Sequence, residues 1–249
     1  GDGDMWRIAA NVGMPFTDNG FANFSVELQD SDATSRSVQR ADAKALYDGG
    51  NKSIWNSPNP AQIWGQPAVS DDIKLVANIG LELDDSKEFY LFGNYAERKV
   101  LGGFYFRNPT NRGGIFSADG GTTRLVGDVA EAAGGTRTCP VVAVPATGAG
   151  SSSDTALTAI KANPNCFVFN EVFPGGFTPS FGGSVSDWSI ASGVKGSTDS
   201  GTLYDVSVSV GENQADYYIE NTLNGSLGPK SPTSFNPGSY VQLEKNFNA

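Results

Sequence analysis

Apolar and polar residues alternate strictly near the start of this 249-residue chain. Every second residue from position 6 to position 16 is apolar, namely Trp6, Ile8, Ala10, Val12, Met14 and Phe16. After a turn at 17–20 the alternation resumes with Ala22, Phe24, Val26 and Leu28. Successive side chains of a β-strand point to opposite faces, so each segment has one apolar and one polar face. The pattern predicts an amphipathic β-hairpin.

The same hairpin pattern occurs twice more along the chain. In the second hairpin, the apolar positions before the turn at 84–87 are Ile73, Leu75, Ala77, Ile79, Leu81 and Leu83. In the third, alternating segments at 187–195 and 204–210 flank a turn at 197–201. A further strand starts near Tyr240 and continues to Ala249. The chain is therefore predicted to be all-β, with about seven antiparallel strands in meander order.

The strand at 88–100 has apolar residues on both faces. One face would hold Phe89, Leu91 and Tyr95, and the other Tyr90, Phe92 and Ala96. We assign the first set to the apolar face, which places Glu97 and Lys99 beyond the apolar region. The polar faces of the strands then carry Arg7, Asn11, Glu27, Lys74, Asn78, Glu82, Asp187, Lys195 and Asp205.

The connections between strands differ greatly in length. Within a hairpin the turn has about four or five residues, whereas the connections at 31–71, 104–183 and 220–238 have about forty, about eighty and about fifteen to twenty. Outer-membrane barrels have short periplasmic turns and long extracellular loops, and compact soluble domains rarely contain such long irregular connections. We therefore expect an antiparallel transmembrane β-barrel in preference to a soluble β-sandwich.

Composition excludes several other classes of protein. No run of about 20 apolar residues is present, so strands are the only means by which this chain could cross a bilayer. The formal net charge of −10 and the lack of a basic stripe argue against a nucleic-acid partner. With no histidine in the chain and no G-x-S-x-G, P-loop or H-E-x-x-H motif, we expect no enzymatic activity.

The ends of the sequence predict an incomplete barrel. The first residues lack the features of a secretory signal peptide, and Ala249 lies inside a predicted strand. We expect residues 1–249 to be a single barrel domain truncated at both ends. Seven strands would leave two unpaired edges, which lipid does not tolerate, so this piece should not close into a barrel alone.

The two cysteines, Cys139 and Cys166, lie in the longest predicted loop. In an exported protein such a pair is expected to form a disulfide, which stabilises by roughly 3 to 4 kcal/mol on the chain-entropy estimate. We predict that this loop folds over the extracellular mouth, opposite the turns at 17–20 and 84–87, with Cα atoms about 4.4 to 6.8 Å apart. Two cysteines without histidine do not form the common zinc sites, and we expect no metal or cofactor.

Six segments together resemble the barrel of TonB-dependent outer-membrane receptors. They read FSVE at 24–27, SRSVQR at 35–40, FGNYAER at 92–98, GGFYFRNP at 102–109, YIENTLN at 218–224 and SFNPGSY at 234–240. The resemblance covers nearly the whole chain and includes no catalytic motif. It implies a bacterial outer-membrane location, contact with outer-membrane lipid, an amino-terminal plug domain and a short TonB-contacting box.

The resemblance also implies a transport function. Members of that family take up scarce ligands such as ferric siderophores, vitamins or oligosaccharides, with energy supplied through TonB. The plug and the box are absent from these residues, so contact with TonB is expected through a missing N-terminal region of the full-length protein. Two other readings stay open, namely a passive porin and a soluble secreted all-β glycan-binding protein.

The candidate ligand-binding residues are aromatic and basic residues of the predicted loops. They are Phe104, Tyr105, Phe106, Arg107 and Arg112 in one loop, and Trp55 and Trp64 in another. Aromatic faces stack on sugar or catechol rings, and guanidinium groups pair with anions. The alternative, which we favour, is that the aromatics anchor the loops or form the interfacial girdle. Residues 41–47, followed by glycines at 49 and 50, are predicted to form a short loop helix.

Overall fold

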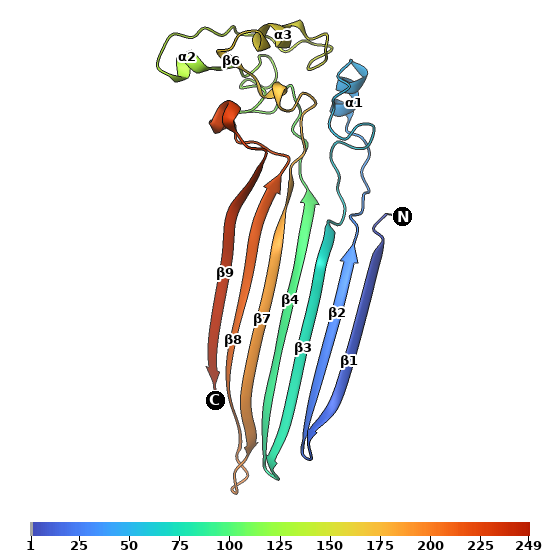
Figure 1. Cartoon of the computed structure of the whole chain (residues 1–249), viewed down its shortest axis with the longest axis vertical. Coiled ribbons are helices and arrows are strands. Elements are labelled where there is room, and N and C mark those ends of the chain that lie inside the picture. The colour runs from blue at the N-terminus through green and yellow to red at the C-terminus, as the bar shows by residue number, and fades with distance from the viewer. Residues whose placement is uncertain (1) are drawn as a thin grey trace.

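The computed structural model describes residues 2–249, and its main element is one seven-stranded antiparallel sheet (Figure 1). The strand order is β1-β2-β3-β4-β7-β8-β9, so each strand pairs with the next long strand along the chain. Their bounds are Met5–Thr17, Gly20–Ser31, Ala68–Asp84, Lys87–Gly103, Ser180–Ser197, Leu203–Glu220 and Ser234–Asn248. The predicted all-β meander is confirmed. Within residues 2–249 the sheet is open, with β1 and β9 at its edges.

The strand register places the alternating residues on two distinct faces. Residues paired across a ladder share a face, and one row of pairs runs Val12, Phe24, Ala77, Gly93, Ile190 and Val210. The adjacent row, on the other face, runs Asn11, Ser25, Val76, Asn94, Ser189 and Gly211. One face of the sheet is therefore apolar over several strands, and the other is mainly polar.

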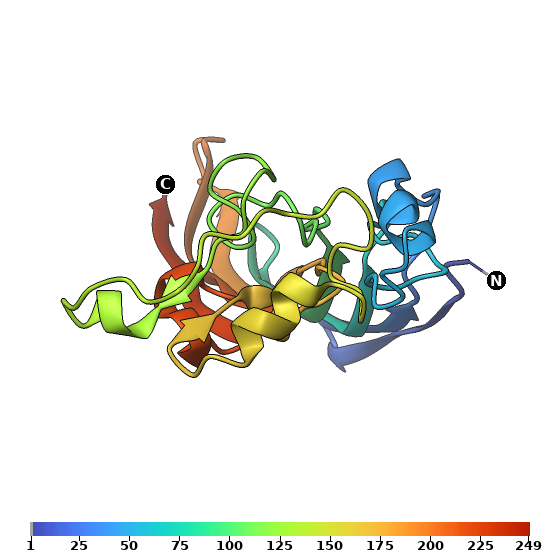
Figure 2. The ribbon, with the colours of Figure 1, turned by 90° about the horizontal axis from the view of Figure 1, so that it is seen from above.

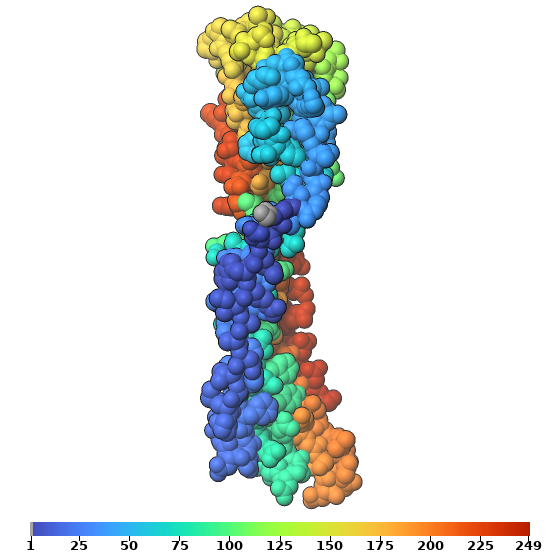
Figure 3. Space-filling view, turned by 90° about the vertical axis from the view of Figure 1, so that its right-hand side faces the viewer, coloured from blue at the N-terminus to red at the C-terminus, as the bar shows by residue number. Residues whose placement is uncertain are grey.

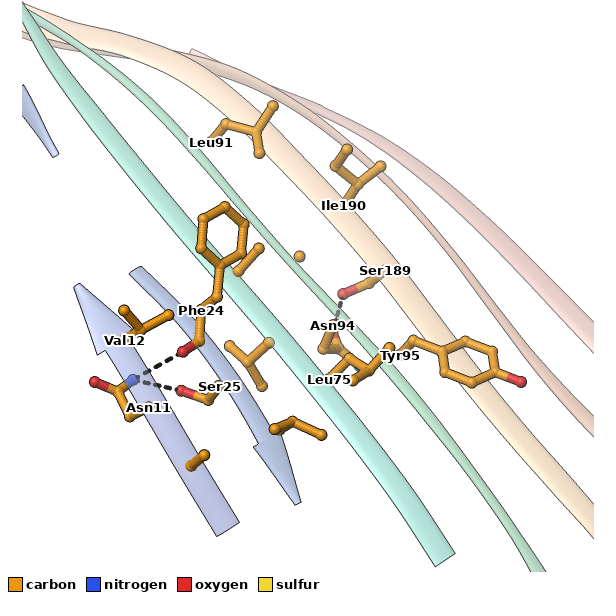
Figure 4. A pocket seen from close by; sticks show the side chains of 15 residues that line it. Asn11, Val12, Phe24, Ser25, Leu75, Leu91, Asn94, Tyr95, Ser189 and Ile190 are labelled. Atoms are coloured by element: carbon orange, nitrogen blue, oxygen red, sulfur yellow. Dashed lines mark hydrogen bonds between the residues drawn. The ribbon is translucent and has the colours of Figure 1, made fainter. Parts of the chain in front are cut away.

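Figure 4 shows both kinds of row in a shallow hollow that crosses five strands. The Asn11 amide donates to Ser25 Oγ at 2.7 Å, and the Ser189 hydroxyl donates to Asn94 Oδ1 at 2.5 Å. Side chains such as Leu91 and Ile190 come from neighbouring positions of the same strands. Cross-strand hydrogen bonds thus join the polar residues along the sheet.

The register of β4 agrees with the predicted assignment. Phe89, Leu91 and Tyr95 pair with Leu81, Ile79 and Leu75, which all belong to the apolar face. Glu97 follows Tyr95 on this face and pairs with Ser186 of β7. The apolar part of the face therefore ends near Tyr95 and its partner Trp188.

The large sheet has almost no buried apolar core. Ala22 is its only buried hydrophobic residue among residues 2–249, whereas Ile8 is 63% exposed and Val208 is 55% exposed. The chain has 14479 Å² of accessible surface, against roughly 10,600 Å² for a compact protein of its mass. Figure 3 views the molecule from the side of β1, with the strands forming a long sheet below the group of loops. No segment among residues 2–249 covers the apolar face.

The three hairpin turns lie at one end of the sheet (Figure 1), and the long connections gather over the other end, which Figure 2 shows from above. We call the gathered loops, residues 32–67, 104–179 and 221–233, the cap. The cap contains α1 (Ala41–Asp48), β5 (Gly127–Asp128), α2 (Val129–Ala132), α3 (Thr155–Lys161), β6 (Cys166–Phe167), and the 3-10 turns η1 (Phe169–Glu171) and η2 (Gly225–Lys230). The predicted helix at 41–47 is confirmed as α1. No helix within residues 2–249 combines the length and the apolarity needed to cross a membrane.

Hydrogen bonds join the three loops into one unit. The Asn51 amide of the first loop donates to the carbonyl oxygens of Ala149 and Pro174 in the second, at 3.1 and 2.9 Å. The Asn221 amide of the third loop donates to the Thr178 carbonyl at 2.7 Å. These side-chain amides donate to backbone carbonyl groups that belong to loops distant in sequence. The hydrogen bonds therefore hold the three loops against one another.

Three small apolar clusters hold the cap together. One surrounds the disulfide and contains Val126, Cys139, Leu157, Ile160, Cys166 and Val168. The second contains Ala43, Ile54, Ala61 and Phe106, and the third contains Phe116, Phe169, Phe177 and Leu223. Cys139 and Cys166 are bonded, with Cα atoms 5.6 Å apart, inside the predicted range. The loop lies at the end of the sheet opposite the hairpin turns, as predicted, and its place over an extracellular mouth stays a prediction.

Candidate ligand-binding site

The segment 104–112 leaves the end of β4 and is held rigidly by its backbone. Arg107 and Phe177 form a two-way bridge, with the Arg107 amide donating at 2.7 Å and the Phe177 amide donating back at 3.2 Å. The buried Asn108 side chain donates to Asp42 at 3.1 Å and accepts from the Thr110 amide at 2.9 Å. The second loop is thereby fixed to its own far end and to the start of α1.

Phe106 is an anchor of this segment. Its side chain is 7% exposed and belongs to the cluster with Ala43, Ile54 and Ala61. Its backbone amide donates to the Gln62 side chain at 2.9 Å. Phe106 therefore anchors the loop, which is the alternative role predicted for these aromatic residues.

Phe104 and Tyr105 have the opposite environment. They are 40% and 54% exposed, and Trp64, 49% exposed, lies beside them. The Trp64 and Tyr105 rings are 5.1 Å apart at 80°, and the Phe104 and Tyr105 rings are 5.6 Å apart at 90°. We call Trp64, Phe104 and Tyr105 the aromatic cluster. It joins two of the loops that supplied candidate residues.

Backbone pairing within the first loop brings Trp64 to this position. The Thr34 amide donates to the Gln66 carbonyl at 3.0 Å, and the Arg36 amide to the Trp64 carbonyl at 3.1 Å. The Trp64 amide in turn donates to Ser37 Oγ at 2.7 Å. Trp55 is not part of this cluster. Its backbone amide donates to the Gly175 carbonyl at 3.2 Å, and no ring pair within residues 2–249 joins it to Trp64, Phe104 or Tyr105.

The aromatic cluster lies at the cap end of β4. On the Tyr95 face of this strand, Glu97 and Lys99 follow Tyr95, and Leu101 is the last large apolar residue. Phe104 comes directly after the strand ends at Gly103. The rings therefore lie beyond the charged positions 97 and 99 of this face.

Arg107 adjoins the aromatic cluster, and Arg112 follows within one turn of chain, with its amide donating to the Asn108 carbonyl at 3.3 Å. The Arg107 guanidinium carbon lies 5.4 Å from the centre of the Phe104 ring. Partial burial, together with the nearby positive charge of Arg112, lowers the pKa of Arg107. Among residues 2–249 no carboxylate forms an ion pair with either arginine. We call Arg107 and Arg112 the arginine pair.

Other arginines of the cap have acidic partners. Arg40 pairs with Asp42 at 2.9 Å, and Arg137 pairs with Glu131 at 2.9 Å. Arg124 pairs with the buried Asp154. Unlike these three arginines, Arg107 and Arg112 form no ion pair with a carboxylate among residues 2–249. Sequence reasoning found both residues but had no means of showing that they lack acidic partners.

The polar face of the sheet carries a second group of charges. Glu27 accepts from Lys74 at 2.7 Å and also pairs with Arg7, and Lys74 lies 3.4 Å from Asp72. These charges compensate one another, as expected for a hydrated surface. Within residues 2–249 no group of three or more histidine, cysteine or acidic side chains is arranged to hold a metal.

Comparison with known proteins adds no family. No protein-family model matches the chain, and a search of curated proteins finds no match.

Proposed function

We propose that the chain is part of the β-barrel of a TonB-dependent outer-membrane receptor that takes up a scarce small ligand. The observation that carries the proposal is the uncovered apolar band on one face of the sheet. On β1 this band runs from Trp6 to Phe16, roughly ten residue steps or about 33 Å of strand. At a tilt of about 40° it is about 25 Å tall, which is the height of the apolar band of outer-membrane barrels.

The opposite face and the two ends support the same proposal. Polar and charged side chains line the face away from the band, as they do in a barrel lumen. Short turns lie at one end and the disulfide-bonded cap at the other, which fits periplasmic turns and extracellular loops. Uptake, the ligand's identity and contact with TonB are proposals that rest on the resemblance of the sequence.

Two charged residues lie within the band. Glu212 pairs with Leu243, and Lys245 pairs with Val210, so both side chains belong to the apolar face of β8 and β9. They are diagonal neighbours across one ladder, a spacing that long side chains can bridge. We expect these opposite charges to compensate each other in lipid.

The soluble alternative requires a protein partner for the band. A β-sandwich buries one apolar face against a second sheet, and the other sheet described in residues 2–249 is the pair β5-β6 in the cap. The three buried clusters also lie in the cap. This arrangement favours lipid as the partner of the apolar face.

Spin labels on two adjacent residues of β8 test the membrane placement. Val208 belongs to the apolar face and Ser209 to the polar face, so Val208→Cys and Ser209→Cys form a matched pair. In outer-membrane vesicles, the label at 208 should be more accessible to oxygen and the label at 209 to a polar nickel chelate. Equal accessibility at both positions, or the reverse order, would contradict a lipid-facing band.

Energy dependence separates a TonB-dependent receptor from a passive porin. Cells that carry the full-length protein should accumulate its ligand against a gradient, and a protonophore should abolish that accumulation. Uptake that persists after the proton gradient is collapsed would identify a porin. A porin would leave the spin-label result unchanged, so the two parts of the proposal can fail separately.

A further inference from the structure

We propose that the aromatic cluster and the arginine pair form a binding site for a small cyclic ligand that carries an oxyanion, such as a carboxylate. The inference deepens the proposed function by naming a ligand class, and it rests on that function only for the site's role in uptake. Aromatic acids and acidic sugars share this chemistry. The experiment below distinguishes them.

The arginine pair supplies the anion-recognition chemistry. A guanidinium group binds a carboxylate or phosphate through two parallel hydrogen bonds. Arg112 follows Arg107 within one turn of chain, with its amide on the Asn108 carbonyl at 3.3 Å, and neither arginine forms an ion pair with a carboxylate among residues 2–249. An oxyanion beside the Phe104 ring would pair with the Arg107 guanidinium and would also be attracted by the positive charge of Arg112.

Arg107 is held in place before a ligand binds. Its backbone is fixed by the bridge to Phe177, and its guanidinium lies near the Phe104 ring. The half-buried side chain has therefore lost part of its hydration and rotamer freedom before any ligand binds. Preorganised groups bind more tightly, since less ordering accompanies association.

The aromatic cluster supplies the ring-recognition chemistry. Its neighbouring rings meet nearly at right angles, an edge-to-face arrangement that covers one ring face at each contact and leaves other ring surface exposed. Each ring is between 40% and 54% exposed, although Phe106 in the same run is buried. A planar or pyranose ring can lie on such a face while its carboxylate meets the arginine pair.

Calorimetric titration of the full-length protein in detergent micelles, with the disulfide intact, tests the site. The probes are benzoate and galacturonate, each with a neutral counterpart, benzyl alcohol and galactose. We expect saturable binding of at least one anion and at least tenfold weaker binding of its neutral counterpart. Preference for benzoate identifies an aromatic acid, and preference for galacturonate identifies an acidic sugar.

Variants assign the binding to the arginine pair. The double substitution Arg107→Gln with Arg112→Gln should weaken anion binding at least tenfold. Lys161→Gln with Lys230→Gln removes two other exposed cap charges and should leave it unchanged. Binding to the unsubstituted chain should also weaken as salt is added, a measurement that does not depend on the folding of any variant.

Three results would overturn the inference. They are no saturable binding of either anion, equal binding of anion and neutral counterpart, and equal losses in the two double variants. None of these results bears on the spin-label test at positions 208 and 209. Failure of the ligand site and failure of the membrane placement are therefore distinguishable.

Discussion

The buried ion pair of the cap offers a sharp test of how the loops are held. Arg124 and Asp154 pair with side chains that are each 1% exposed. Asp154 also accepts from the Gly150 amide at 2.8 Å and from the Leu157 amide at 3.3 Å, the latter at the start of α3. Arg124 donates to Asn170 at 3.2 Å. One carboxylate thus joins α3 to two other parts of the second loop.

Asp154→Ala should open the cap locally. Removing one partner leaves a buried, uncompensated arginine, which costs about 3 to 5 kcal/mol. At about 1.4 kcal/mol per factor of ten, this is roughly a hundredfold to several-thousandfold rise in the open population. Hydrogen exchange of peptides covering residues 123–127 and 155–161 should speed up by that factor, while exchange in β7 and β8 stays unchanged.

Two further variants complete the test. Arg124→Met with Asp154→Leu removes both charges and should recover most of the protection, because a buried pair replaced by apolar groups is often neutral. Asp48→Ala removes an exposed carboxylate that pairs with Lys44 and should change exchange by less than about threefold. A rise below about tenfold for Asp154→Ala, or no recovery in the double variant, would refute the reasoning.

Three other predictions concern the disulfide, the sheet and acid. Replacing Cys139 and Cys166 by alanine should destabilise the cap by about 3.6 kcal/mol, because the disulfide no longer reduces the chain entropy of the unfolded loop. Hydrogen exchange of the cap at increasing denaturant concentration measures this loss. An unchanged denaturant midpoint for cap opening would contradict the prediction. A Cβ at Gly193 would lie 2.5 Å from the Tyr90 hydroxyl, so Gly193→Val should cost about 1 to 3 kcal/mol and reduce the folded fraction on semi-native gels. Tyr90→Ala should restore part of the folded fraction, because the Ser207 Cβ, 2.8 Å from the added atom, stays in place, and no gain at all would exclude the clash with Tyr90. Burial opposes ionisation of Asp128, but backbone amides of residues 130, 131, 138 and 139 lower its pKa to about 2. The stabilisation is present above the unfolded pKa of about 3.9 and is lost as pH falls towards 2, so pepsin should cut the cap faster over this window. Asp128→Asn should remove this pH dependence, and an unaltered pH profile would contradict the prediction.

Local periodicity determined most of the sheet. Alternation at Trp6 to Phe16 and at Ile73 to Leu83 specified which residues share a face, because side-chain direction in a strand depends only on position along it. The turns and the meander order followed from the spacing of these segments. The predicted disulfide was also available from sequence, since both cysteines belong to one loop.

Only the tertiary structure decided the candidate site. Phe106 and Tyr105 are adjacent in an aromatic run, yet one is buried and the other exposed. Trp64 reaches Tyr105 through pairing inside another loop, and Trp55 does not. No periodic pattern encodes these outcomes, because they depend on contacts between distant residues. Asn51 and Pro174, for example, are separated by 123 positions. The sequence by itself determined the faces of the strands, and the packing of three loops against one another determined which aromatic and basic side chains remain exposed.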